Sequence, residues 1–503
     1  MASILGIDIG TSSVKAIVYD TETHTVLAVA NQEYPIYNPQ PGYAEQHPDD
    51  WWQAVIQVTR RVVAATSQPV AAIGLTGQMH GTVLLDAAHK PLHPAIIWAD
   101  QRSASVIPSM IEAVGAARYA SIAGTLPAAG FMGPTLVWLQ QHQPHILDEA
   151  RHVLLPKDEV RLRLTGQLAT EVSDAASTGI FDISHQHWSE EIIKTVGIPT
   201  HILPHILDST TIAGELTTSS AAALSLTPGI PVVAGCADQP AQAIANGLVS
   251  MGRASVTIGT GGQVFVPLMR EANMSRIPTD PRLHVFNHAV PGMWYILGAI
   301  LSAGLSLRWL RDLVGLRDTR DAYERLSAEA AEVPPGADGL VFLPYLVGER
   351  TPHMDPLARG AFVGLSYHHT RGHMARAVME GVTFALRQTL EISLSMSQPV
   401  EQVIAAGGGA ESALWRQIQA DIYGLPLQRS VVQEQTCIGA ALLAAVGTGA
   451  VDDFNTANGA GSGELIEPNT QNTPVYTSLY AQFLDLYPRL TENFHTLSKM
   501  TIS

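Results

Sequence analysis

The chain has 503 residues, 46% hydrophobic and 15% charged, a composition that predicts two compact globular domains and excludes an intrinsically disordered chain. With 29 basic and 45 acidic residues, its formal net charge is −16, which excludes nonspecific electrostatic binding to nucleic acid and to anionic membranes. We therefore expect its partners to be small molecules, or a second copy of the chain in a homodimer.

The first predicted elements form an antiparallel meander. Apolar strands are expected at residues 4–10 and 13–20, on either side of a Gly-Thr-Ser-Ser tip, and a third strand is expected at 25–36 after the turn "TETH". Because the connections are short, the three strands should pair in sequence order.

The pattern then changes to alternating helix and strand. Apolar residues recur at helical spacing over residues 47–65, where Asp49 or Asp50 is the expected N-cap. A strand is expected at 70–77. The change of period predicts an α/β domain.

A second hairpin of the first kind is predicted at residues 253–268. Its tip is Gly259-Thr260, and the first tip is Gly10-Thr11, about half the chain away. Two halves that open with the same hairpin indicate a duplicated domain; a chance match of two tight turns is the alternative. The second half continues with predicted helices at 297–313, 411–424, 436–449 and 475–487, a strand and helix within 360–386, a strand at 403–409, and loops at 344–356 and 452–474.

Neither the cysteines nor the N-terminus indicates export. Cys236 and Cys437 lie far apart within apolar stretches, which is typical of reduced buried thiols. The chain enters a strand pattern at once, without a basic leader, and contains no run of about 18 uninterrupted apolar residues. The sequence predicts a cytoplasmic protein without a membrane span.

The two Gly-Thr tips are candidate phosphate-binding turns, because the sequence contains neither a Walker P-loop nor a G-x-G-x-x-G motif. Turn amides and hydroxyl groups can hold phosphate oxygens without a lysine. Each tip alone is more often an ordinary tight turn. The candidate residues are Gly10, Thr11 and Ser12 in the first half and Gly259, Thr260 and Gly261 in the second.

Asp8 stands in an otherwise apolar strand beside the first tip, where a carboxylate must be desolvated unless a positive group meets it. Mg²⁺ carried by ATP suits this position, since Mg²⁺ prefers one or two carboxylates together with phosphate oxygens. The alternative is an aspartate that hydrogen bonds to its own turn. Lys15 could add charge near the phosphates, or could be an exposed strand lysine.

Two histidine pairs, His201 with His205 and His284 with His288, are four residues apart. The first pair brackets a proline and the second lies in a strand-like run, so neither forms the helical face of a zinc site. We interpret both pairs as structural.

Five segments together resemble the FGGY family of carbohydrate kinases, in order and across nearly the whole chain. The resemblance implies an α/β fold of two actin-like, ribonuclease H-type domains, residues 1–249 and 250–503, with a cleft between them. It implies ATP and Mg²⁺ as cofactors, with the sugar and the catalytic aspartate on the N-terminal side and the nucleotide on the C-terminal side. The segments are "GIDIGTSSVKA", "TGQMHG", "GCADQPAQAIANG", "TIGTGGQ" and "GAFVGLSYHHTRGHMARAVMEG".

The resemblance also assigns the binding residues. It implies that Met79, His80 and Gln239 contact the sugar, although His80 on its own would be read as a core histidine. It is nearest to the kinases of D-xylulose; a kinase of another ketose, polyol or sugar acid is the closest alternative, and an actin-like or chaperone-type ATPase is an alternative of another class. It further implies that Gly408, Gly409 and Ser412 border the adenosine, and the chain departs from the family at Thr135, where a lysine is usual.

Asp238 is the predicted general base, at the junction of an apolar strand and a helix. In phosphoryl transfer a carboxylate can orient the acceptor hydroxyl and take its proton. The alternative is a helix N-cap, since Pro240 lies in the first turn; the two roles are compatible.

Overall fold

The computed structural model describes residues 3–270, 277–455 and 462–500, and the chain divides into two compact units. The first unit includes two segments that follow residue 249. The predicted domain boundary between residues 249 and 250 therefore stays a prediction. The first unit is Met1–Val249, Met269–Tyr295 and Val432–Ala460, and the second is Ser250–Leu268, Ile296–Val431 and Gly461–Ser503.

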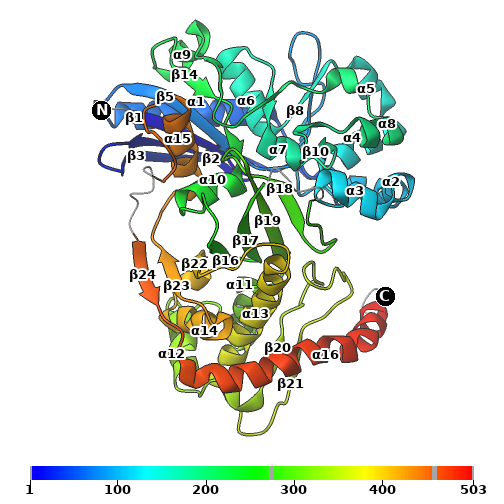
Figure 1. The fold of residues 1–503 in the computed structure, drawn as a ribbon, viewed down its shortest axis with the longest axis vertical. Coiled ribbons are helices and arrows are strands. Elements are labelled where there is room, and N and C mark those ends of the chain that lie inside the picture. The colour runs from blue at the N-terminus through cyan, green and yellow to red at the C-terminus, as the bar shows by residue number, and fades with distance from the viewer. Residues whose placement is uncertain (1–2, 271–276, 456–461, 501–503) are drawn as a thin grey trace. The chain divides into compact units, whose positions relative to one another are not determined.

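A seven-stranded sheet forms the centre of the first unit (Figure 1). Its first three strands pair antiparallel in sequence order, which confirms the predicted meander. The next two strands to pair with this group, β5 and β14, run parallel to β1 and to β5 respectively. The strand order is β13 (Ile212–Glu215), β14 (Pro231–Val233), β5 (Val70–Gly77), β1 (Ser3–Ile9), β2 (Ser13–Asp20) and β3 (Thr25–Glu33), and β15 (Cys236–Ala237) also pairs with β5.

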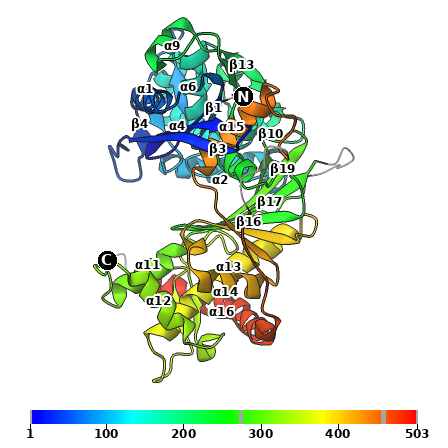
Figure 2. The same ribbon diagram turned by 90° about the vertical axis from the view of Figure 1, so that its left-hand side faces the viewer.

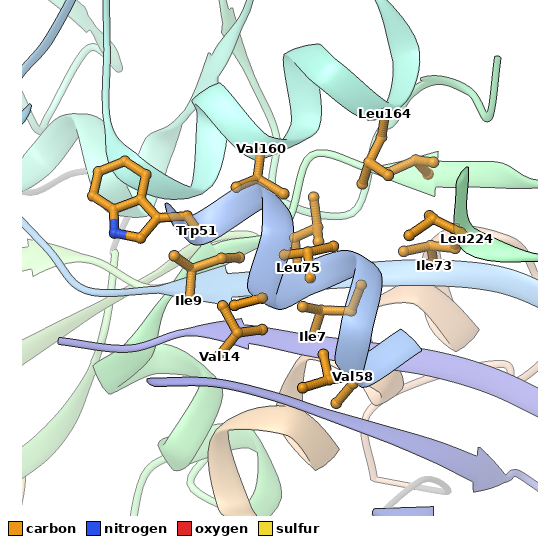
Figure 3. Packing of buried hydrophobic residues seen from close by; sticks show 14 of the residues in the cluster. Ile7, Ile9, Val14, Trp51, Val58, Ile73, Leu75, Val160, Leu164 and Leu224 are labelled. Carbon is orange, nitrogen blue, oxygen red and sulfur yellow. The ribbon is translucent and has the colours of Figure 1, made fainter. Parts of the chain in front are cut away.

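Helices cover both faces of this sheet because alternate strand residues point to opposite sides. Ile7 and Ile9 of β1 pack in a buried cluster with α1, α6 and α9 (Figure 3). Leu5 belongs to the same cluster, whereas Ile4 packs with α10 and α15. Asp8 therefore faces the side of α10 and α15. The five helices are α1 (Pro48–Ala64), α6 (Pro156–Thr165), α9 (Thr218–Leu224), α10 (Asp238–Ala245) and α15 (Gln435–Gly447).

Helix α15 contacts the strand backbones directly. A Cβ atom added at Gly6 would lie 2.2 Å from the Cys437 carbonyl oxygen, and one added at Gly74 would lie 1.9 Å from that of Ala440. Only glycine permits this approach, so these two positions fix how close α15 lies to β1 and β5.

Five further helices of the first unit enclose a separate apolar cluster that includes Met110, Tyr119 and Leu136. Each fully buried apolar side chain of this size contributes about 1.5–3 kcal/mol to stability. These helices are α2 (Ile107–Val114), α3 (Ala116–Ala123), α4 (Met132–His142), α5 (Pro144–Glu149) and α8 (Glu190–Val196). The unit also contains α7 (Val172–Ala176); its short strands are β4 (Glu45–Gln46), β6 (Val83–Leu85), β7 (Ala95–Ile96), β8 (His152–Leu154), β9 (Thr170–Glu171), β10 (Phe181–Asp182), β11 (His187–Trp188) and β12 (Ile206–Leu207).

The second sheet repeats the central pattern of the first (Figure 2). Its hairpin strands β16 and β17 are antiparallel, and β16 pairs in parallel with β22, as β1 pairs with β5. This shared pairing supports the predicted duplication over a chance match of turns. The strand order is β18 (His284–Asn287), β19 (Met293–Ile300), β17 (Gly262–Met269), β16 (Arg253–Ile258), β22 (Gln402–Ala406), β23 (Leu427–Ser430) and β24 (Ser462–Ile466).

The other elements confirm most of the predicted second half. Tyr476, Tyr480 and Phe483 are buried on the terminal helix, as their spacing indicates, and among the described residues no helix is long and apolar enough to cross a membrane. The elements are α11 (Gly304–Leu313), α12 (Ala322–Ala331), α13 (Arg371–Leu394), α14 (Ala413–Tyr423), α16 (Thr473–Met500), β20 (Val341–Leu343) and β21 (Ala361–Val363).

Three local predictions are wrong. The N-cap of α1 is His47 and not Asp49 or Asp50, because Pro48 already occupies the first helical position. The predicted helix at 297–313 begins as strand β19, whose continuous apolar run does not distinguish a buried strand from a helix. The predicted loop at 452–474 contains β24, which pairs with β23; residues 456–461 of that loop lie outside the described residues.

Candidate active site

The candidate residues of the first unit gather where parallel strands end. Asp8 of β1 and Cys236 of β15 both pair with Thr76 of β5. Because parallel strands direct their carboxyl ends to one edge, this register brings the β1 tip, the "QMH" segment after β5 and Asp238 after β15 to the same edge of the sheet. Ligands of open α/β sheets bind at such edges.

Asp8 is held by α15 and not by its own turn. Its Oδ2 accepts a hydrogen bond from Thr436 Oγ1 at 2.7 Å, whereas the turn is closed by the Gly10 amide, which donates to the Ser13 carbonyl at 3.1 Å. The self-capping alternative is therefore wrong. Asp8 Oδ1 is buried and accepts no hydrogen bond from the described residues. Burial raises the pKa of Asp8, so a cation at this oxygen would offset the cost of its charge; an unpaired carboxylate oxygen fits the ligand preference of Mg²⁺.

The tip beside Asp8 is packed on one side and exposed on the other. Thr11 Oγ1 accepts a hydrogen bond from Trp98 Nε1 at 2.8 Å, whereas Ser12 is exposed. Lys15 forms an ion pair with Glu434 Oε2 at 2.8 Å. The structure thus gives Lys15 a protein partner that the sequence did not indicate, and its contact with phosphate stays a prediction.

Asp238 is the first residue of α10, and Ala237 is the N-cap, which forms no side-chain cap. The N-cap alternative for Asp238 is therefore wrong. Its Oδ1 is buried and unpaired among the described residues. Burial, and then the nearby charge of Asp8, raise the pKa of Asp238 to about 7. A carboxyl group with this pKa can accept and release a proton near neutral pH.

The predicted sugar residues follow β5. Met79 is buried, and His80 has a left-handed backbone with φ of 71°. His80 Nδ1 lies 2.6 Å from the Ser177 carbonyl oxygen, and its ring stacks on Phe131 with centroids 4.0 Å apart. Gln239, half-buried, follows Asp238 in the first turn of α10. These contacts fix the His80 ring at the edge of the sheet that Asp238 also occupies.

All the predicted nucleotide residues of the second unit except Gly261 line a single cavity of about 820 Å³. Its volume falls within the roughly 300–1,000 Å³ typical of small-molecule sites. Ser412 caps α14 by accepting the Trp415 amide, and its hydroxyl lies 2.8 Å from that of Ser327. The Gly261 carbonyl closes the tip by accepting the Gly259 amide at 2.9 Å. The predicted lining residues are Gly259, Thr260, Gly408, Gly409 and Ser412, and sequence reasoning missed Leu307, Arg308, Tyr323, Ser327 and Met379.

The cysteines agree with their structural interpretation, and the structural interpretation of the histidine pairs stays a prediction. Cys236 and Cys437 are buried and free. His288 is buried, which lowers its pKa to about 3, and its Nδ1 accepts the Val290 amide. Within the described residues, three possible metal ligands meet only at Asp182, His185 and His187, a group that includes neither pair.

Comparison with known proteins identifies the family. Models of the N-terminal and C-terminal domains of the FGGY family of carbohydrate kinases match residues 3–245 and 254–448. The chain belongs to the FGGY family of carbohydrate kinases. It is a carbohydrate kinase with two actin-like domains of the α/β class, each built around one of the two sheets described above.

Individual FGGY kinases match almost end to end. The chain is 36% identical to a xylulose kinase of Lactococcus lactis over 99% of both chains, and 31% identical to a gluconokinase of Bacillus subtilis over 98% of this chain and 97% of the relative. The crystal structure of xylulose kinase from Rhodospirillum rubrum superimposes with a TM-score of 0.92 at 31% identity, covering 98% of this chain and all of the other.

Proposed function

We propose that this FGGY kinase phosphorylates D-xylulose, converting D-xylulose and ATP to D-xylulose 5-phosphate and ADP. The observation that carries the proposal is the unpaired, buried Oδ1 of Asp238, whose pKa is raised to about 7, at the same sheet edge as Met79 and His80. A base whose pKa is near 7, next to side chains that bind the sugar, can take the proton of a sugar hydroxyl as that hydroxyl attacks a phosphoryl group. Similarity to xylulose kinases supports the choice of sugar.

Each group of residues in the proposed site has its own role. Asp238 accepts a hydrogen bond from the attacking hydroxyl and takes its proton as the bond from the sugar oxygen to the γ-phosphorus forms and the bond from that phosphorus to ADP breaks, which releases ADP. His80 and Gln239 orient the sugar by hydrogen bonds, and Met79 supplies an apolar wall. The tip amides of Gly10–Ser12 and Gly259–Gly261 hold phosphate oxygens, and the cavity lined by Gly408, Gly409 and Ser412 holds the adenosine.

Asp8 would hold Mg²⁺ through Oδ1, the buried oxygen without a partner among the described residues. The ion, when bound with ATP, neutralises negative charge that develops on the phosphates. Thr436 holds the carboxylate by its hydrogen bond to Oδ2.

A coupled assay of ADP release with a panel of sugars tests the proposal. D-xylulose is expected to give the highest kcat/KM, above gluconate, glycerol and other ketoses. A higher value for gluconate would assign the chain to the sugar-acid kinases, to which it is also similar. ATP hydrolysis at the full rate without any sugar would support the actin-like ATPase alternative.

Replacing His80 by alanine is expected to raise the KM for D-xylulose roughly 5- to 150-fold, because a lost hydrogen bond to a sugar hydroxyl costs about 1–3 kcal/mol. The KM for ATP should change much less. His142→Ala is the matched control, since His142 also stacks on an aromatic ring, that of Trp138, and its Nδ1 lies 3.0 Å from a backbone carbonyl. Equal effects of the two substitutions would remove His80 from the sugar site.

The rate should depend on pH through Asp238. The base must be ionised, so kcat/KM for D-xylulose should rise as pH increases through about 7 and level off above it, falling about tenfold per pH unit on the acid side. Measurement at saturating MgATP removes the contribution of nucleotide binding. A profile that is flat from pH 5 to 8 would contradict the assignment of Asp238 as base.

A further inference from the structure

A cluster of buried charges lies behind the candidate site and has no part in the mechanism above. Lys157 Nζ lies 2.7 Å from Asp158 Oδ1, 3.2 Å from Asp174 Oδ2 and 3.6 Å from Glu171 Oε1. Arg161 Nη1 lies 2.9 Å from the same oxygen of Asp158. All five side chains are fully buried.

Burying such a cluster costs free energy. Desolvating several charges commonly costs more than their attraction returns, and apolar residues of similar size would stabilise a core at least as well. Two cations face three carboxylates here, and burial raises the pKa of Asp174 well above its ordinary range. A proton on Asp174 makes the cluster neutral overall. The cluster is therefore tolerated by the fold, and its stabilising value alone does not account for it.

The cluster holds the segment of residues 234–237, which leads to Asp238. Arg161 Nη1 donates to the Ala234 carbonyl at 2.6 Å. At the other end of this segment, Ser173 Oγ accepts the Ala237 amide at 3.0 Å and donates to Glu171 Oε1 at 2.8 Å. The backbone is thus tied at both ends of residues 234–237, immediately before the candidate base.

The same residues support His80. Glu171 is the N-cap of α7 and accepts the amides of Ser173 and Asp174, and Asp174 is paired with Lys157. The helix ends at Ala176, and the carbonyl oxygen of its C-cap residue, Ser177, lies 2.6 Å from His80 Nδ1. One short helix therefore contacts the residue before Asp238 near its beginning and His80 at its end.

Lys157 also lies under both chain segments of the site. A Cβ atom added at Gly77 would lie 3.3 Å from Lys157 Cβ, and one added at Gly235 would lie 3.1 Å from Lys157 Cδ. Gly77 immediately precedes the "QMH" segment, and Gly235 precedes Asp238 by three residues. The aliphatic part of the Lys157 side chain therefore packs against both the "QMH" segment and the segment that precedes Asp238.

We infer that Lys157, Glu171, Ser173 and Asp174 are positioning residues that set the place of Asp238 relative to His80, and so align the sugar hydroxyl with its base. The inference rests on the proposed function, because it takes Asp238 as the base and His80 as a sugar ligand. α7 connects the buried charges to Asp238 through the Ser173 side chain, and to His80 through the Ser177 carbonyl group.

Ser173→Ala tests the inference with a small change. It removes the acceptor of the Ala237 amide and a donor to Glu171, and should lower kcat about tenfold or more, because small displacements of reacting groups cost up to about 10²-fold. The KM for ATP and the affinity for ADP should stay within about twofold of wild type. Ser220→Ala is the matched control, since Ser220 is also buried in the first unit and donates to a carbonyl, that of Arg163, at 2.6 Å; it should leave kcat unchanged.

A double-mutant cycle separates positioning from a general loss of stability. When Ser173→Ala is combined with His80→Ala, the effects on kcat/KM for D-xylulose should be strongly non-additive, because residues linked in one network couple whereas distant sites do not. Ser220→Ala should be additive with His80→Ala. If Ser173→Ala does not fold, Ser173→Cys keeps the volume, weakens both hydrogen bonds and should lower kcat in the same direction.

The outcomes distinguish this inference from the proposed function. Wild-type kcat in folded Ser173→Ala and Ser173→Cys, or additivity with His80→Ala, overturns the positioning role if Asp238→Ala is inactive. Normal turnover in Asp238→Ala overturns the assignment of the base instead. Equal losses in Ser173→Ala and Ser220→Ala would reduce Ser173 to a structural residue.

Discussion

Asp238→Ala is expected to lower kcat by at least about 10³-fold, since a general base contributes on the order of 10² to 10⁴ and this residue also orients the hydroxyl. Its Oδ1 is buried and accepts no hydrogen bond from the described residues, so we expect a substrate hydroxyl to be its hydrogen-bond partner. Nucleotide affinity should be retained, because the predicted adenosine residues belong to a cavity of the second unit. Steady-state kinetics together with calorimetric titration of ADP give both quantities.

Loss of turnover in an Asp238 variant must be distinguished from loss of folding. Replacing Asp238 is expected to lower turnover but to raise stability. Burial raises the pKa of Asp238 from 3.8 to about 7, so the native protein binds this proton more tightly than the unfolded chain does. The free energy of unfolding should therefore fall as pH rises from about 4 to 7, by at most about 4 kcal/mol. Asp238→Asn removes this cost and should raise the melting temperature at pH 8 while abolishing turnover.

Asp49→Ala is the matched control, because Asp49 also lies in the first turn of a helix of the first unit. It should keep wild-type turnover and show no rise in melting temperature. More than a tenth of wild-type turnover in Asp238→Ala would show that Asp238 is not the base.

Asp8→Ala should lower turnover about 10²-fold or more, because it removes the carboxylate expected to place the metal and the phosphates. Unlike Asp238→Ala, it should recover part of its activity when Mg²⁺ is raised, since a weakened metal site can be filled by mass action. Titration of kcat against Mg²⁺ in the two variants measures the difference.

Asp20→Ala serves as the control for Asp8. Asp20 ends β2 in the same sheet and accepts the amides of Glu22 and Thr23, so its loss should leave the Mg²⁺ dependence unchanged. Wild-type turnover and Mg²⁺ dependence in Asp8→Ala would remove Asp8 from the metal site.

Local patterns predicted those parts of the site that depend on a short stretch of chain. The Gly-Thr tips were predicted because turns have residue preferences that act over a few positions, whereas Ser412 was predicted from the resemblance to the FGGY family. Asp8 was found because a carboxylate in an apolar strand requires a partner. Its partner, Thr436, is 428 residues away, and only the register of α15 against β1 brings the two together.

The buried charges could not be found in the same way. Lys157, Asp158 and Glu171 resemble the polar residues of any exposed helix or loop, and the sequence does not show that the first turn of α6 faces inward. The walls of the cavity in the second unit escaped prediction for a related reason: Arg308 and Tyr323 lie on separate helices, α11 and α12, and only packing brings them to one cavity. Burial is decided by packing, which acts across the whole unit.

The repeated hairpin has an evolutionary consequence. Asp8 pairs with Lys15 and Thr76, and the corresponding position of the second sheet is Thr257, which pairs with Gln263 and Ala406. Each is followed by the same three residues, Ile-Gly-Thr. An ancestor with two identical halves would have carried a carboxylate at both tips or at neither. Divergence at this one position makes the two halves chemically different, which duplication alone does not. From then on, neither half can be replaced by a copy of the other.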